Sequence, residues 1–309
     1  MSDERINRLR ENIAKVYAGS RQVIDQLLTA LLSGGHILIE DVPGIGKTTL
    51  ARALADSLTM DFARVQFTPD TLPSDILGTT VFDVKEQSFR VIRGPVFHSF
   101  LLADEINRTS PKTQSALLEA MEEHQVTIDG TTYPLPDPFL VVATQNPVEQ
   151  LGTYPLPEAE LDRFLMKLSL GYPGKEEQTL LAKRFLSGAL REPVKPVINT
   201  EELVEMINAV KQVIYSDELI AYTLDIVEAT RKEKEVSCGV SPRGGLDLLR
   251  ASQAWAYISG RDYVIPEDVI EMAKLVLPHR IMLTTEAKID HYSGYQVVLN
   301  VLNRVKRPQ

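Results

Sequence analysis

Short apolar runs alternate with helical patterns in the first half of the chain. Each run is four to six residues long, which is the length expected of a buried strand. The runs span residues 36–40, 63–67, 100–103, 139–144 and 165–170. Because helical stretches separate them, the pattern predicts a parallel β-sheet with helices on both of its faces.

The second half of the chain has a different periodicity. From about residue 175 the strand-like runs stop, and apolar residues recur at the spacing of amphipathic helices over residues 201–213 and 217–230. A Tyr-Pro-Gly-Lys segment marks the border between the two patterns. With 309 residues, the chain is long enough for two domains that each bury a core. We therefore predict an α/β domain over residues 1–174 and a smaller all-helical domain over residues 175–309.

Two segments of the first half have the pattern of inserted β-hairpins. Residues 126–133 place Asp129 and Gly130 between Thr- and Ile-rich arms, and Asp-Gly is a strong signal for a two-residue hairpin turn. Residues 79–93 are strand-like on both sides of a polar turn and end at a Gly-Pro pair. We expect both hairpins to be additions to the parallel sheet.

Composition and charge narrow the class of protein. With 44% apolar and 24% charged residues, the chain is close to the average of soluble globular proteins. No apolar run is longer than five residues, whereas a membrane span needs about 20. Residues 1–10 are charged where a secretory signal would be apolar, so we expect a cytoplasmic protein. The net charge of -9 argues against nucleic acid as a partner.

Cysteine and histidine usage offers no metal or redox site. The single Cys238 excludes an internal disulfide, and the five histidines lack metal-ligand spacing.

The sharpest local signal is Pro-Gly-Ile-Gly-Lys-Thr-Thr at residues 43–49. It follows the apolar run at 37–39 and begins the helical pattern at 50–58, which is the strand, loop and helix order of a phosphate-binding loop. The glycines let backbone amides face a phosphate, and the helix N-terminus adds partial positive charge. The predicted nucleotide-binding residues are Gly44, Ile45, Gly46, Lys47, Thr48 and Thr49.

Individual positions of this loop have separate roles. Lys47 would contact the β- and γ-phosphates, and the Thr48 hydroxyl would bind Mg²⁺. The strict pattern G-x-x-x-x-G-K-[ST] fails, because Asp41 stands at the position of the first glycine. The alternative interpretation is an ordinary strand-to-helix turn with a solvated lysine.

Polar residues also follow two of the predicted strands. Asp104 and Glu105 come directly after the run at 100–103, and Asn146 follows the run at 139–144. The carboxyl ends of parallel strands are where α/β sheets bind ligands. Asp104 suits a place in the Mg²⁺ shell, Glu105 suits activation of a water, and Asn146 could orient that water. Taken alone, each of these residues could also be an ordinary loop residue.

The order of these motifs resembles that of the AAA+ ATPases. Residues 161–164 (LDRF) look like an arginine-finger segment, and residues 241–243 (SPR) look like a sensor 2 segment. The resemblance is to the MoxR family in particular, and it covers about residues 10–290. It is most specific in three segments, residues 35–48, 101–123 and 153–164.

Arg243 also stands out by a physical argument. Ser241 and Pro242 make a good N-cap and first helical position, which puts Arg243 in the first turn of a helix. The helix dipole disfavours a cation there by about 0.3–1 kcal/mol. A local rule broken in this way often marks a functional site.

The resemblance implies an α/β core followed by a helical lid, with ATP and Mg²⁺ as cofactors and a hexameric ring as the assembly. Asp104 and Glu105 match Walker B, and Asn146 matches sensor 1. Arg163 would reach the nucleotide of a neighbouring subunit, and Arg243 would contact the γ-phosphate from the lid of its own subunit. The two hairpins would face the pore of the ring and contact a client protein.

The resemblance also implies a class of work. Similar proteins couple ATP hydrolysis to remodelling, maturation or metal-cofactor insertion of a client, together with partners that carry a von Willebrand factor A domain. Four alternatives stay open at this point: a magnesium-chelatase-type motor subunit, a self-contained P-loop enzyme, a nucleotide-controlled binding module and a nucleic-acid motor.

Overall fold

The computed structural model describes residues 3–42, 44–146, 152–188 and 194–308, so Pro43 of the predicted loop lies outside the described residues. The α-helices are α1 (Glu4–Ala14), α2 (Arg21–Leu32), α3 (Lys47–Ser57), α4 (Pro73–Leu77), α5 (Pro111–Glu123), α6 (Lys175–Ser187), α7 (Thr200–Val210), α8 (Asp217–Thr230), α9 (Pro242–Ile258), α10 (Pro266–Val276), α11 (Thr285–Ile289) and α12 (Gly294–Arg304). The short 3₁₀ turns are η1 (Pro95–Phe97), η2 (Ile106–Arg108), η3 (Leu161–Arg163) and η5 (Pro278–Arg280). The strands are β1 (Ile37–Glu40), β2 (Phe62–Gln66), β3 (Gly78–Asp83), β4 (Ser88–Arg93), β5 (Phe100–Asp104), β6 (Gln125–Ile128), β7 (Thr131–Pro134), β8 (Leu140–Gln145), β9 (Met166–Leu168), β10 (Val236–Cys238) and β11 (Met282–Leu283).

The five predicted runs form one parallel sheet in the order β2-β5-β8-β1-β9. β1 lies between β8 and β9, with Ile37 opposite both Val142 and Met166. All strands point the same way, so the segments that follow β1, β5 and β8 meet at one edge. This edge carries the predicted phosphate loop, the acidic pair and Asn146, and the predicted fold class is confirmed.

Both faces of the sheet are buried, and alternate residues of a strand enter different apolar clusters. Ile37 and Ile39 belong to one cluster, and Leu38 belongs to the other. The first cluster continues through α1, α2 and α3 into the helices of the C-terminal half, whereas the second joins the sheet to α4, α5 and the hairpins. The cores therefore divide by sheet face and not at residue 174; the domain boundary itself stays a prediction.

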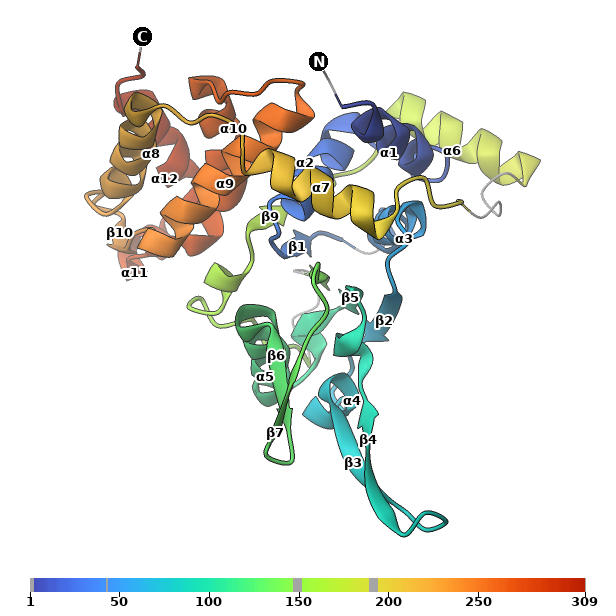
Figure 1. Cartoon of the computed structure of the whole chain (residues 1–309). Coiled ribbons are helices and arrows are strands. Elements are labelled where there is room, and N and C mark those ends of the chain that lie inside the picture. Colours follow the sequence, from blue (N-terminus) through green and yellow to red (C-terminus); the bar gives the residue numbers. More distant parts are fainter. Residues whose placement is uncertain (1–2, 43, 147–151, 189–193, 309) are drawn as a thin grey trace.

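Both predicted hairpins are present. β3 pairs with β4 from Gly78–Arg93 to Asp83–Ser88, and this hairpin projects from the body of the molecule at the lower edge of Figure 1. A glycine is needed at its base, because a Cβ on Gly78 would lie 2.3 Å from the backbone oxygen of Ile92. The β6–β7 turn uses positive φ at Asp129 and Gly130, as the Asp-Gly signal predicts.

The C-terminal half is a helical lid with one short ladder, β10–β11. Serine hydroxyls accept hydrogen bonds from backbone amides at the starts of α8, α9 and α12. In Figure 1 the lid helices α8, α10 and α12 lie toward the left of the view, whereas α1, α3 and α6 lie toward the right. Along the described parts of the chain, no helix is both long and apolar enough to span a bilayer.

Candidate active site

The phosphate-loop sequence forms a tight turn between β1 and α3. Gly44 and Gly46 have φ of +82° and +93°, a left-handed conformation that glycine adopts without strain. The Lys47 ammonium donates to the backbone oxygens of Asp41 at 2.6 Å and Gln145 at 3.3 Å. Burial lowers the pKa of Lys47, and nearby carboxylates oppose this shift. The phosphate loop thus surrounds the Lys47 ammonium, which lies next to the positive end of the α3 dipole.

Asp104, the last residue of β5, is joined to three neighbouring side chains. Its Oδ2 accepts hydrogen bonds from Thr48 Oγ1 at 3.3 Å and Arg64 Nη2 at 2.7 Å, and its Oδ1 accepts one from Thr144 Oγ1 at 2.6 Å. Arg64 and Thr144 come from β2 and β8, the two strands that flank β5. Because Asp104 is only 7% exposed, these contacts stabilise a buried charge.

Glu105 follows in a left-handed conformation, with φ +59° and ψ +49°, which costs a non-glycine residue about 1 kcal/mol. Its carboxylate accepts hydrogen bonds from Gln66 Nε2 at 2.8 Å and Arg108 Nη1 at 3.1 Å, and its amide donates to Thr144 Oγ1 at 2.9 Å. Because of this strained turn, the carboxylates of Asp104 and Glu105 point to different hydrogen-bond partners. Strain of this kind is typical of functional sites.

Asn146 follows β8 and lines the same cleft. It is 3% exposed, and its carbonyl accepts a hydrogen bond from Asn107 Nδ2 at 3.2 Å. The cleft has a volume of about 350 Å³ and is lined by Gly44, Gly46, Lys47, Thr48, Thr49, Arg64, Gln66, Asp104, Glu105 and Asn146. The structure therefore brings together the predicted loop residues other than Ile45, the acidic pair and Asn146.

A second cavity, of about 260 Å³, shares Gly44, Gly46 and Thr49 with this cleft. Ile45 lines it, as do Tyr17 and residues 170–173. The phosphate loop thus separates a polar cleft from a cavity with an aromatic wall.

Asp41 connects the phosphate loop to the wall of the second cavity. Its Oδ2 accepts hydrogen bonds from Ser169 Oγ at 2.9 Å, from the Leu170 amide at 2.6 Å and from the Gly171 amide at 3.0 Å. A glycine at position 41 has no side chain that could make these contacts. Asp41, at the position of the first glycine, therefore connects the phosphate loop to residues 169–171, which a glycine could not do.

Arg163 and Arg243 lie together, away from the polar cleft. Arg163 Nε donates to Glu122 Oε2 at 2.6 Å, and Arg243 Nη1 donates to the other oxygen of the same carboxylate. The hydrogen bond from Arg163, with the charge of Arg243, holds the pKa of Glu122 below its usual value. The three side chains line a cavity of about 330 Å³ together with Gly35 and His36.

This arginine cavity lies at the amino-terminal edge of the sheet, because Gly35 and His36 directly precede β1. The phosphate loop directly follows β1 and so lies at the opposite edge. α5 runs back from the acidic pair to Glu122 over 13 residues, which is about 20 Å of helix. Neither Arg163 nor Arg243 is among the described residues that line the polar cleft.

The structure does not bring Arg243 to the nucleotide cleft of its own chain, and its contact with a nucleotide stays a prediction. The reason is the anchoring of α9. Its N-cap hydroxyl, on Ser241, donates to Asp162 Oδ2 at 3.0 Å, which fixes the start of the helix beside η3 and not over the phosphate loop.

Comparison with known proteins places this site in a family. A family described as "ATPase family associated with various cellular activities (AAA)" matches residues 36–166, and a family described as "AAA lid domain" matches residues 228–299. The chain is 42% identical to Chaperone MoxR1 of Mycobacterium tuberculosis, over 96% of this chain and 81% of that protein. The chain is a MoxR-family AAA+ ATPase. It is thus an ATP hydrolase with a nucleotide-binding core and a helical lid.

Other relatives of this MoxR-family ATPase agree. It is 50% identical to the uncharacterised protein YeaC of Bacillus subtilis, over 96% of this chain and 93% of that one. It is 32% identical to the protein MoxR of Methylorubrum extorquens, over 89% and 87% of the two chains. A crystal structure from Cytophaga hutchinsonii, assigned as an ATPase, superimposes with a TM-score of 0.92 at 42% identity, covering 99% of this chain and 96% of that one.

The polar cleft of this MoxR-family ATPase fits a magnesium-bound nucleotide. The Thr48 hydroxyl and the Asp104 carboxylate approach each other at 3.3 Å, and both are oxygen ligands of the kind that Mg²⁺ takes alongside phosphate oxygens and water. Within the described residues, no three histidine, cysteine or carboxylate side chains cluster so as to hold a metal alone. The donor set therefore fits a metal that enters with a phosphate ligand.

Sequence reasoning missed several residues of the site. Arg64 and Gln66 contact the acidic pair from β2, and their alternation in the run Ala-Arg-Val-Gln-Phe is the signal that could have shown them on one face. Tyr17 is the sole aromatic residue among the first 61, which singles it out as a candidate for the cavity wall.

Proposed function

We propose that this MoxR-family protein works as a homo-oligomeric, Mg²⁺-dependent ATPase, most simply as a hexameric ring, in which each nucleotide is completed by arginines of the neighbouring subunit. The observation that carries the proposal is the position of Arg163 and Arg243. They lie side by side at the sheet edge opposite the polar cleft, where a neighbouring subunit can present its own cleft to them.

In this proposal the residues of one chain prepare the phosphates and the water. Lys47 and the loop amides would hold the β- and γ-phosphates, and Thr48 and Asp104 would hold the metal. A bound Mg²⁺ would supply positive charge that neutralises the phosphate oxygens. Glu105 accepts a proton from the attacking water, and Asn146 orients that water. The base of the nucleotide occupies the cavity beside Tyr17 and Ile45.

The neighbouring subunit supplies positive charge to the γ-phosphate. Arg163 and Arg243 exchange Glu122 for the γ-phosphate oxygens and neutralise the charge that develops there during hydrolysis. Hydrolysis then depends on assembly, because neither half of the site is sufficient alone.

The work done with this energy is remodelling or maturation of a client protein. The β3–β4 hairpin supports this, because Phe82 and Phe89 are 52% and 75% exposed and pack edge to face at 5.2 Å between ring centroids. Exposed apolar patches on a protein surface commonly mark sites that bind other proteins. One relative, from Mycobacterium tuberculosis, is named a chaperone. A partner with a von Willebrand factor A domain and insertion of a metal cofactor are the narrower forms of this proposal.

Mixing two inactive variants tests the shared site. Glu105→Gln removes the base and Arg163→Ala removes the neighbour's charge, so each alone should lose at least about 100-fold in Mg-ATPase rate. A mixed assembly contains interfaces with an intact Glu105 on one side and an intact Arg163 on the other. We expect mixing to restore part of the rate. If both variants assemble and mixing restores nothing, the shared site is refuted and a self-contained P-loop enzyme is favoured.

A further inference from the structure

Among the described residues of the lid, Arg280 is the most deeply buried arginine, and the proposed chemistry does not use it. It ends η5, its side chain is 1% exposed, and burial lowers its pKa. A buried guanidinium is costly unless each of its N–H groups has a partner. The identity of those partners therefore shows what this residue holds together.

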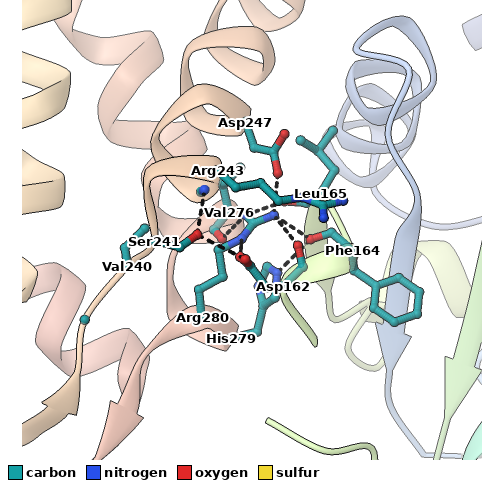
Figure 2. Close-up of polar contacts among 12 residues, drawn as sticks. Asp162, Phe164, Leu165, Val240, Ser241, Arg243, Asp247, Val276, His279 and Arg280 are labelled. Atoms are coloured by element: carbon teal, nitrogen blue, oxygen red, sulfur yellow. Dashed lines mark hydrogen bonds and ion pairs between the residues drawn. The ribbon is translucent and has the colours of Figure 1, made fainter. Parts of the chain in front are cut away.

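The partners of Arg280 come from residues 162–165, from α9 and from the end of α10, where Nη1 donates to the Val276 carbonyl at 2.6 Å (Figure 2). Nε donates to Asp162 Oδ1 at 2.7 Å, and Nη2 donates to Asp247 Oδ2 at 2.7 Å. The guanidinium also donates to the carbonyls of Phe164 at 2.8 Å and Leu165 at 3.1 Å. Asp162 and Phe164 flank Arg163, and Leu165 follows one residue later. Asp247 lies one helical turn after Arg243.

Asp162 links the finger segment, which carries Arg163, to the first turn of α9, which carries Arg243. One of its oxygens accepts from Arg280, and the other accepts from Ser241 Oγ at 3.0 Å. Ser241 is the N-cap of α9, and its hydroxyl also accepts the Gly244 amide at 3.1 Å. Gly244 leaves room for this packing, because a Cβ there would lie 2.8 Å from Arg280 Cδ. The first turn of α9 and the finger segment are thus one hydrogen-bonded unit.

We propose that Arg280 is a positioning residue for ATP hydrolysis: it locks the Arg163 segment to the first turn of α9, so that Arg163 and Arg243 reach a neighbour's nucleotide as a fixed pair. This inference rests on the proposed shared site. It assigns to Arg280 an effect on the neighbouring subunit and none on the nucleotide cleft of its own chain.

Arg280→Lys tests this, because one ammonium cannot span Asp162, Asp247 and the carbonyls together. A displacement of reacting groups by about 1 Å can cost about 100-fold in rate. We expect Arg280→Lys to lower the Mg-ATPase rate about 10- to 100-fold, while the affinity of its own site for a fluorescent ATP analogue and its assembly stay unchanged.

Mixing experiments then separate positioning from a purely structural role. Arg280→Lys mixed with Glu105→Gln should recover activity, because the second variant supplies intact arginines. Arg280→Lys mixed with Arg163→Ala should recover none, because both variants damage the same half of the site. Recovery in that second mixture, or a wild-type rate for Arg280→Lys alone, overturns the inference.

A matched control comes from the same domain. Arg261 forms a bidentate pair with Asp268, at 2.6 Å for both contacts, in the lid but away from the finger segment. Arg261→Lys should lower the melting temperature as Arg280→Lys does, yet keep the ATPase rate. If Arg261→Lys also loses the rate, lid stability explains the effect and the inference fails.

Failure of the proposed function and failure of a variant to fold are distinguished from the results above. If Glu105→Gln and Arg163→Ala do not complement each other, the proposed function fails before Arg280 is considered. If Arg280→Lys does not fold, Asp162→Asn replaces it in both mixtures, since it keeps the shape of the network and removes the charge. The same pattern of recovery is expected, and complementation between Asp162→Asn and Arg163→Ala overturns the inference.

Discussion

Replacing Asp41 with glycine should weaken ATP binding, although it restores the strict phosphate-loop pattern. In most P-loops the glycine at this position serves the turn itself. Here the carboxylate ties the loop to Ser169, Leu170 and Gly171, which lead into the wall of the second cavity. Without the Asp41 carboxylate, we expect the phosphate loop to keep its shape and the wall of the second cavity to lose its hydrogen bonds to the loop.

The magnitude follows from the hydrogen bonds that are lost. Three of them end on Oδ2, and bonds to a charged acceptor contribute about 1.5–3 kcal/mol each. Ser169 and Gly171 are exposed, so water replaces part of this contribution. A net loss of about 1.4–2.8 kcal/mol corresponds to about a 10- to 100-fold increase in the KM for ATP.

The assay compares ATP with tripolyphosphate, which has the phosphates and lacks the base. Asp41→Gly should raise the KM for ATP, leave kcat nearly unchanged and leave inhibition by tripolyphosphate unaffected. Asp41→Asn should have a smaller effect, because its amide oxygen still accepts hydrogen bonds but has no charge. Ser169→Ala removes one contact of the three and should change the KM by no more than about fivefold.

Two results would refute this reasoning. An unchanged KM for ATP in Asp41→Gly would mean that the wall is positioned without the carboxylate. An equal loss of ATP and tripolyphosphate affinity would mean that Asp41 acts on the phosphate loop and not on the base side of the site.

Two further predictions concern stability and the client. Burial lowers the pKa of His36 to about 4 and that of His279 to about 3, from 6.5. Their contribution to stability is therefore complete above pH 6.5 and is lost as the pH falls from there, toward 4 for His36 and toward 3 for His279. Urea unfolding should show about 2–3 kcal/mol less stability at pH 5.5 than at pH 7.5. An equal loss in a His36→Gln/His279→Gln variant would exclude these groups as the cause. We expect an unfolded model client, reduced and carboxymethylated α-lactalbumin, to stimulate the ATPase. A Phe82→Ser/Phe89→Ser variant should keep its basal ATPase rate and lose this stimulation, whereas Glu86→Ser in the turn of the same hairpin should keep both. Stimulation that survives in the double variant would exclude the hairpin as the client contact.

The sheet, the phosphate loop and both hairpins could be predicted because their signals are local. A strand needs a short apolar run, and the loop needs glycines between a strand and a helix. The edge of a parallel sheet then brings Lys47, Asp104, Glu105 and Asn146 together without further information.

The arrangement of the arginines could not be predicted in this way. Glu122 lies 41 residues from Arg163 and 121 residues from Arg243 along the chain, and no periodicity links such distant positions. The same holds for Asp41, whose partners lie 128 to 130 residues later. The packing of the lid against η3 decides at which edge of the sheet Arg163 and Arg243 lie.

The cost of burying Arg280 argues that its function is geometric. Removing the Arg280 guanidinium from water is expensive, and an apolar replacement of similar volume often gives equal or greater stability. Stability alone therefore does not account for an arginine here. What an apolar side chain could not do is hold Asp162 and Asp247 at fixed distances through directed hydrogen bonds, 2.7 Å in each case. Because Asp162 directly precedes Arg163 and Asp247 follows Arg243 by one helical turn, the same bonds set the distance between the two arginines. A shared active site needs that distance fixed before the neighbouring subunit arrives.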